Sequence, residues 1–137
     1  MDVLNQLLVK RQHIRELVEK YEEIRTKMLS PPSASDYSYH GRRSGESRIE
    51  RYHDKAEKLR LKIADEEIEM IDLKTTVYNQ IEQLSDEINK DILFYRYICG
   101  YKWTEIAKQR DVCVRWVYRK HQEALKEWDQ VYGKEGD

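Results

Sequence analysis

The sequence predicts an all-α protein, with a long N-terminal antiparallel helical hairpin or coiled coil followed by a compact C-terminal helical domain. Two long stretches repeat apolar residues at alternating spacings of three and four, which is the period of paired helices. No segment alternates apolar and polar residues beyond a few positions, so we expect no strands. The 137 residues are 37% charged and 39% hydrophobic, a balance typical of long, solvated helices.

The first helix is expected over residues 2–29. Lys10 and Arg11 interrupt its apolar stripe once, and the stripe then continues at spacings of three and four. Its members are Leu7, Ile14, Leu17, Tyr21, Ile24 and Met28. Such a stripe predicts packing against another helix. Pro31 disfavours helix at the residue before it, and we interpret residues 30–44, rich in small and turn-forming residues, as a flexible loop.

A second, longer helix is expected over residues 45–83. Its apolar seam consists of Ile49, Tyr52, Ala56, Leu59, Ile63, Met70, Leu73, Val77 and Leu84, with Glu66 at one seam position. This helix would be roughly 60 Å long and would need a partner along much of its length. The first helix can fold back over part of it. The seam from Met70 to Leu84 then needs another partner, either the C-terminal domain or a second copy of the chain. We favour a homodimer formed through these two helices.

Residues 1–84 therefore form the predicted hairpin, and residues 85–132 form the predicted C-terminal domain. Ser85 or Asp86 is a suitable cap for a short helix, which Gly100 would end. The remaining elements are a second short helix over 101–110, a tight turn at 111–113, a last helix over 114–132 and a disordered tail at 133–137.

Two short helices joined by a three-residue turn are typical of a helix-turn-helix. Ala107 provides the small side chain that a close helix crossing needs, and the expected core comprises Ile106, Val112, Val117 and Leu125. A helix fits the DNA major groove, where its N-terminal half reads base edges. We expect residues 114–128 to be this recognition helix, with the DNA-binding residues Val114, Arg115, Tyr118, Arg119 and Gln122. Lys108 and Arg110 are expected to meet phosphates at the groove edge.

The charge distribution agrees with this assignment, although the net charge is only −1. Residues 63–91 hold nine acidic and two basic residues, a net of −7, whereas residues 92–128 hold eight basic and four acidic residues, a net of +4. Residues 40–62 also have a net charge of +4, from the same numbers of basic and acidic residues. A nearly neutral total therefore conceals a basic C-terminal module.

The C-terminal third resembles region 4 of bacterial sigma factors. The matching segments are Arg96-Tyr97-Ile98-Cys99-Gly100-Tyr101, Glu105-Ile106-Ala107, Val117 and Ala124-Leu125. Over its full length the chain is similar to small phage or prophage regulators of the RinA and ArpU type. The segment Trp116-Val117-Tyr118-Arg119-Lys120-His121 supports that similarity. The resemblance implies a transcription regulator of phage genes in the cytoplasm of a bacterial host, with double-stranded DNA as its partner and RNA polymerase as a further contact.

Three residues depart from the pattern of such modules. Lys102 stands where a Ser or Thr cap is common, and Asp111 stands where the turn usually carries Gly. Cys113 replaces the usual Ser cap of the last helix, and a thiol is a weaker acceptor. Losing a cap costs about 1 kcal/mol, so we expect the module to fold with altered fine geometry.

Two other binding functions remain open from the sequence. One is a phage DNA-packaging protein of the small-terminase kind, although such proteins usually carry the DNA-binding part first. The other is an adaptor that contacts RNA polymerase without binding DNA, which the acidic residues 63–91 permit. Substituting Arg115 and Arg119 separates the adaptor from the DNA-binding regulator.

The sequence offers no sign of an enzyme, a cofactor or a membrane protein. Cys99 and Cys113 lack the spacing of a zinc site and are expected to be reduced thiols. No Gly-rich phosphate loop is present, and no apolar run approaches the length of a membrane span. His121 lies on the face of Val117 and Leu125, so we expect a packed histidine rather than a catalytic one.

Overall fold

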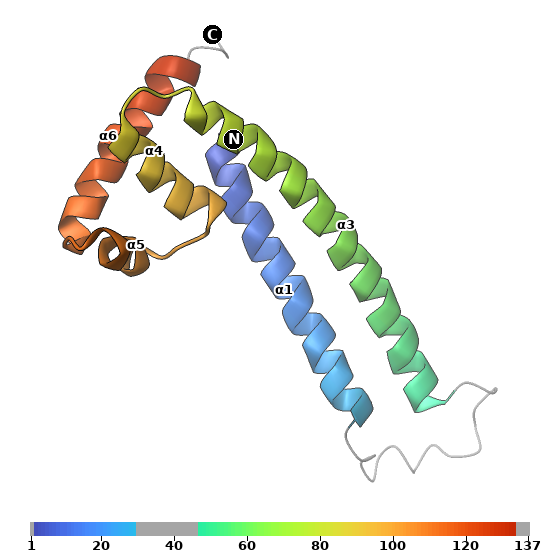
Figure 1. Ribbon diagram of the computed structural model, residues 1–137. Helices are drawn as coiled ribbons and strands as arrows, with labels where there is room; N and C mark the ends of the chain where they lie inside the picture. The colour runs from blue at the N-terminus through green and yellow to red at the C-terminus, as the bar shows by residue number, and fades with distance from the viewer. Residues whose placement is uncertain (1, 30–46, 134–137) are drawn as a thin grey trace. The chain divides into compact units, whose positions relative to one another are not determined.

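The computed structural model describes residues 2–29 and 47–133, and within these ranges every regular element is a helix (Figure 1). The elements in order are α1 (Val3–Leu29), α3 (Arg48–Glu82), α4 (Glu87–Leu93), the π-helix η1 (Phe94–Ile98), α5 (Trp103–Arg110) and α6 (Val114–Tyr132). The all-α prediction is confirmed for the described residues. The predicted loop at 30–44 lies outside them, as does the predicted tail except for Gly133.

The chain divides into two compact units. The middle unit comprises residues 12–69, and the C-terminal unit comprises residues 1–11 and 70–137. The sequence suggested a domain boundary between residues 84 and 85, whereas this division falls within α1 and α3. The start of α1 and the last part of α3 therefore belong to the same unit as the short C-terminal helices.

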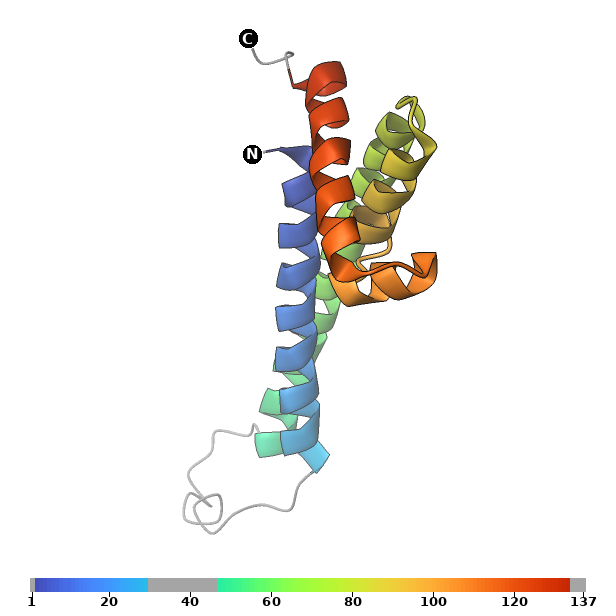
Figure 2. The same ribbon diagram turned by 90° about the vertical axis from the view of Figure 1, so that its left-hand side faces the viewer.

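In the middle unit, α1 and α3 run side by side in opposite directions (Figure 1, Figure 2). The Arg48 guanidinium donates to the Lys27 carbonyl at 2.7 Å, and His13 Nε2 lies 3.4 Å from Glu66 Oε1 at the other end. Glu66, the polar interruption in the predicted seam, thus faces a polar group on α1. The apolar seam lies between the helices, but only Leu17 and Ala56 are buried there.

The predicted seam over residues 49–84 is exposed at its start and buried at its end. Ile49 is exposed rather than covered, because it lies in the first turn of α3, near the end of the paired segment. The remaining seam, represented by Met70, Val77 and Leu84, is buried within the C-terminal unit. From the sequence, either the C-terminal domain or a second copy of the chain could cover this half of the seam. In the structure, the C-terminal unit of the same chain covers it.

The C-terminal unit has a closed core. Ile92, Ile106, Ala107 and Val117 form its buried cluster. α6 packs against both α4 and α5, and α5 lies across the N-terminal end of α6 (Figure 1, Figure 2). The sequence assigned Leu125 to this core, but Leu125 is only half-buried. Ala124 is fully buried instead, because it shares the spacing of Val117 on α6.

Candidate nucleic-acid interface

The segment from α5 to α6 contains the sharp turn that the sequence predicted at residues 111–113. Asp111 ends α5 in the left-handed conformation, with φ 57° and ψ 50°. Aspartate can stand in place of the usual glycine here because it tolerates the left-handed conformation better than most residues. The Val112 amide donates to the Ala107 carbonyl at 3.0 Å, which closes the turn. The turn therefore has the predicted length and position.

The N-termini of the two helices that this turn joins are capped differently. The sequence expected a helix over 101–110, but α5 begins at Trp103 with Lys102 as its N-cap residue. The Glu105 carboxylate accepts a hydrogen bond from the Lys102 amide at 2.7 Å, which supplies part of the missing cap. Cys113 caps α6 with extended backbone and makes no side-chain capping hydrogen bond.

Helix α6 has two opposite faces with the same internal spacing. Its buried residues are Val117, His121, Ala124 and Trp128. Two positions before each of them lies an exposed polar residue, and these are Arg115, Arg119, Gln122 and Lys126. Because two residues correspond to about 200° around an α-helix, the basic and buried stripes lie on opposite sides. Folding α6 onto the core therefore presents the basic stripe to solvent.

The predicted DNA-binding residues differ in their exposure and in their contacts with the rest of the protein. Arg115 and Arg119 are exposed and make no hydrogen bond or ion pair with any described residue. Gln122 and Lys108 are also exposed. Tyr118 is exposed too, although its ring lies edge-on against Trp103, with centroids 5.4 Å apart. The stripe thus carries two arginines with no partner within the described chain.

Two residues of the predicted set are placed differently. Val114 is half-buried and packs against the core cluster, so it is not part of the exposed stripe. Arg110 donates to the Asp91 carboxylate at 2.7 Å. That ion pair links α5 to α4 and occupies part of the guanidinium that was expected to meet a phosphate.

A buried polar pair lies behind the basic stripe. The Tyr97 hydroxyl and His121 Nε2 share a hydrogen bond of 2.8 Å, and the Trp103 ring lies edge-on to His121 at 4.6 Å. Burial, with a smaller contribution from Arg96, lowers the pKa of His121 to about 4. Burial also raises the pKa of Tyr97 to about 12. Both side chains are therefore neutral at pH 7, and the prediction of a packed histidine is confirmed.

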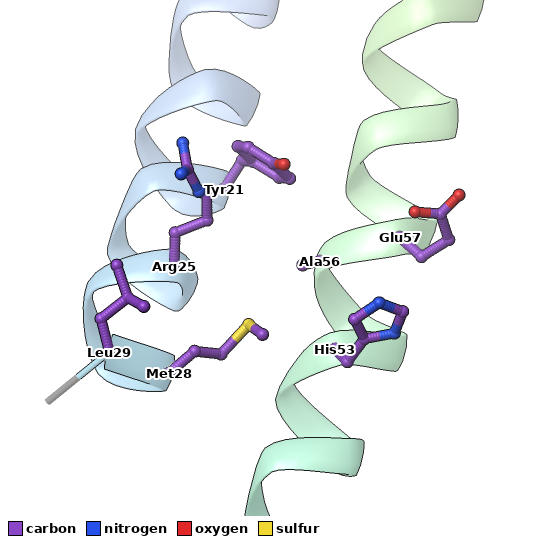
Figure 3. A pocket seen from close by; sticks show the side chains of 7 residues that line it. All are labelled: Tyr21, Arg25, Met28, Leu29, His53, Ala56 and Glu57. Atoms are coloured by element: carbon purple, nitrogen blue, oxygen red, sulfur yellow. The ribbon is translucent and has the colours of Figure 1, made fainter. Parts of the chain in front are cut away.

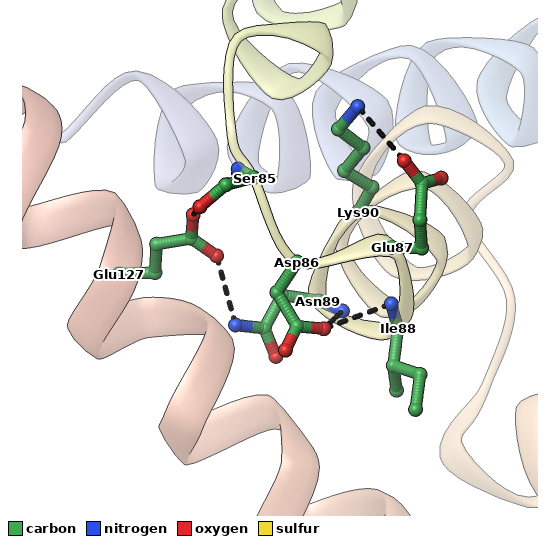
Figure 4. Close-up of polar contacts among 7 residues, drawn as sticks. All are labelled: Ser85, Asp86, Glu87, Ile88, Asn89, Lys90 and Glu127. Carbon is green, nitrogen blue, oxygen red and sulfur yellow. Dashed lines mark hydrogen bonds and ion pairs between the residues drawn. The ribbon is translucent and has the colours of Figure 1, made fainter.

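A carboxylate on α6 fixes the beginning of α4 (Figure 4). Glu127 Oε2 accepts from the Ser85 amide at 2.7 Å and from its hydroxyl at 3.0 Å, and Oε1 accepts from the Asn89 side chain at 2.9 Å. Partial burial alone would raise the pKa of Glu127, but these hydrogen bonds together outweigh it and lower the pKa. Asp86 caps the same helix by accepting from the Ile88 and Asn89 amides, as one of the two predicted caps.

The role of Arg11 does not follow from the sequence pattern, in which Arg11 only interrupts the apolar stripe. In the structure, the Arg11 guanidinium donates to the carbonyls of Tyr97 and Ile98 at 2.9 and 3.0 Å. These hydrogen bonds satisfy the end of η1, where Gly100 turns the chain with φ +74°. A Cβ at Gly100 would lie 2.7 Å from Arg11 Nε. The basic pair Lys10-Arg11 within an apolar stripe is the sequence signal for this contact.

The middle unit contains an open cavity of about 250 Å³ near the ends of its two helices (Figure 3). It is lined by Tyr21, Arg25, Met28, Leu29, His53, Ala56 and Glu57. Glu57, the one carboxylate in this lining, already binds Arg60 at 2.6 Å. The cavity therefore lacks a free acidic group opposite its histidine, and we assign no chemistry to it.

Neither a metal site nor a membrane span was found in the part of the chain that the structure describes. There, no three His, Cys, Asp or Glu side chains are grouped so that they could hold a metal ion. Of the described helices, none combines the length and apolarity needed to cross a bilayer. Both cysteines are exposed thiols without a disulfide.

Comparisons with protein-family models, with curated proteins and with solved structures find no match to this chain. The resemblance of its C-terminal third to sigma-factor region 4 therefore depends on the sequence motifs alone.

Proposed function

We propose that the protein is a sequence-specific DNA-binding transcription regulator, with α5 and α6 acting as a helix-turn-helix. The observation that carries the proposal is the exposed stripe of α6, in which Arg115 and Arg119 have no partner among the described residues. They lie one helical turn apart in the N-terminal half of the helix, the half that reads base edges when a helix enters the major groove. Arginine binds guanine through two hydrogen bonds.

The surroundings of the stripe support the same function. Lys108 on α5 and Lys126 further along α6 are exposed and add positive charge on either side of the arginines. The α6 N-terminus has no side-chain cap, and the start of a helix favours a phosphate group. Hydrogen bonds that Glu127 accepts and the packing around His121 hold α6 in place behind this face. A helix held in this way can read bases at low entropic cost.

The resemblance stated above narrows the proposal to a regulator encoded by a phage or prophage and acting in the cytoplasm of a bacterial host. Contact with RNA polymerase belongs to the same proposal. Among the described residues, no particular surface supports the contact with RNA polymerase, whereas the α6 stripe supports DNA binding.

The proposal is tested by selecting from a pool of random duplexes with the purified chain. We expect one motif to be enriched by the wild type and lost by the double variant Arg115→Ala/Arg119→Ala. The matched control is Lys58→Ala/Lys62→Ala, which removes two exposed charges with the same spacing from α3. Circular dichroism checks that both variants keep their helices.

The alternatives give different results in the same experiment. No enrichment, together with no salt-dependent binding to any duplex, would overturn DNA binding and favour the polymerase adaptor. A ring-shaped oligomer that binds DNA without enriching a motif would favour a packaging protein.

A further inference from the structure

Within the middle unit, α3 carries a row of positive side chains beside its seam. The row consists of Arg51, Lys55, Lys58 and Lys62, all of which are exposed. Their spacings of four, three and four put them on one face of the helix. The three lysines make no hydrogen bond or ion pair with any described residue. The row is therefore a surface of positive charge that the described chain does not neutralise.

Helix α1 extends this row across the edge of the middle unit. The two helices are antiparallel, and Arg48 on α3 donates to the Lys27 carbonyl on α1. One heptad further along each helix, Lys55 therefore lies opposite Lys20. Lys20 is exposed as well and makes no hydrogen bond or ion pair with any described residue. The basic edge of the middle unit thus comprises Lys20, Lys55, Lys58 and Lys62.

The basic edge does nothing to hold the two helices together. Residues that flank the seam of paired helices commonly form ion pairs of opposite charge between the helices, whereas here Lys20 faces Lys55. Lys27, the next basic residue at this edge of α1, is instead neutralised by Glu23 at 3.4 Å. Two like charges at facing positions repel each other, and a bound polyanion would remove that repulsion.

The edge also lacks the side chains on which a protein interface depends. Protein partners bind mainly through apolar and aromatic anchors that are buried at the centre of the contact. Among the described residues of the middle unit, the exposed large apolar side chains occupy other positions of the heptad repeat, and these are Val18, Leu29, Ile49, Leu61 and Ile68. Positive charge without an apolar anchor fits the phosphate backbone of a nucleic acid, where lysines bind by neutralising charge.

We propose that the basic edge binds the phosphate backbone of duplex DNA, outside the motif that α6 reads. The choice of DNA rests on the proposed function, because a chain bound through α6 keeps its middle unit at a high local concentration beside the same duplex. Contacts to phosphates carry no sequence information. Lys58→Ala/Lys62→Ala should therefore still enrich the motif in the selection experiment, while it weakens binding to long duplexes.

The test is a salt titration of DNA binding by the full chain, followed by fluorescence anisotropy. One duplex is trimmed to the selected motif, and the other adds about 20 base pairs, or two helical turns, on either side. The edge variant is Lys20→Gln/Lys55→Gln, because glutamine has a helix propensity close to that of lysine.

The matched control is Arg15→Gln/Arg60→Gln, which also removes one exposed positive charge from each helix. Arg15 and Arg60 each follow a seam residue, whereas Lys20 and Lys55 each precede one. The control charges therefore lie on the opposite edge of the helix pair. Circular dichroism checks that both variants keep their helices.

On the long duplex, each lost phosphate contact should make the plot of log affinity against log salt shallower by about 0.9. Between about 50 and 200 mM salt, the wild type should therefore lose about tenfold more affinity than the edge variant. The control should keep the wild-type slope. All three proteins should bind the trimmed duplex alike.

An edge variant that keeps the wild-type slope on the long duplex would overturn the proposal. An equally shallow slope in the control would also overturn it, because the effect would then come from net charge. An equal loss on the trimmed duplex would contradict binding outside the motif. If the selection yields no motif, the same comparison on a long random-sequence duplex still tests the edge, so its failure is distinguishable from failure of the proposed function.

Discussion

The two compact units of this protein bury their apolar residues to very different degrees. Among the described residues of the middle unit, only Leu17 and Ala56 are buried apolar residues, and the other seam residues there stay partly open to water. In the C-terminal unit Ile92, Ile106 and Val117 are completely inaccessible. The sequence motifs are equally regular in both units. The difference arises because two helices meet along a single line, whereas a third and a fourth helix enclose a core from several sides.

The largest expected effect on stability comes from removing apolar side-chain volume from the C-terminal unit, and the same change in the middle unit provides the comparison. Ile106→Ala should lower the free energy of unfolding by about 2–5 kcal/mol, because it opens a cavity in the closed core. Ile63→Ala, which truncates a half-buried seam residue in the middle unit, should cost less than half as much. Denaturant titration measures both losses.

Tryptophan fluorescence reports on the C-terminal unit alone, because all three tryptophans, at positions 103, 116 and 128, lie in it. Circular dichroism follows the helices of both units. Equal losses of stability for the two isoleucine variants would contradict the claimed difference between closed and open packing.

A pH titration is expected to destabilise the C-terminal unit through His121. Its pKa is lowered to about 4 in the folded protein, against about 6.5 in an unfolded chain. The unfolded state therefore binds a proton first as the pH falls. Stability should be unaffected by this group above pH 6.5 and should decrease by about 3 kcal/mol between pH 6.5 and 4.

The variant His121→Gln isolates this contribution from that of the carboxylates. It keeps a hydrogen-bonding group beside Tyr97 but does not titrate, so its stability should fall less steeply over the same pH range. Identical pH profiles for the two proteins would show that His121 does not become protonated on unfolding.

A smaller effect is expected from Glu127, which joins α6 to the start of α4. Glu127→Gln keeps one carbonyl oxygen but removes the charge and part of the hydrogen bonding, and it should cost about 1–2 kcal/mol. Glu123→Gln is the matched control, because Glu123 forms only an exposed pair with Lys120 at 3.3 Å. That substitution should change stability by less than about 0.5 kcal/mol. Similar losses in both variants would contradict the role assigned to Glu127.

Periodicity and local turn chemistry predicted much of the fold. The ends of the first and last helices, the Asp86 cap and the turn at Asp111 all depend on residues close together in the chain. The elements that the sequence did not reveal depend on distant partners. The η1 π-helix, for example, ends where Arg11 binds carbonyls 86 and 87 residues away.

The same distinction applies to the candidate site. Heptad and helix spacing identified the stripe that contains Arg115, Arg119 and Gln122, because a face opposite a buried stripe follows from the sequence. The pairing of Arg110 with Asp91 and the burial of Val114 did not follow from it. Both depend on how closely α5 and α6 pack against α4, which no spacing within a single helix specifies.

The central claim is that the exposed stripe of α6 contacts DNA, and NMR chemical-shift mapping tests it most directly. A duplex obtained by selection is titrated into the labelled chain, and backbone amide shifts are followed residue by residue. We expect the largest changes at Arg115, Tyr118, Arg119 and the 111–113 turn, with little change in residues 12–29 and 48–69. Changes confined to the middle unit, or an absence of changes at saturating duplex, would contradict the account.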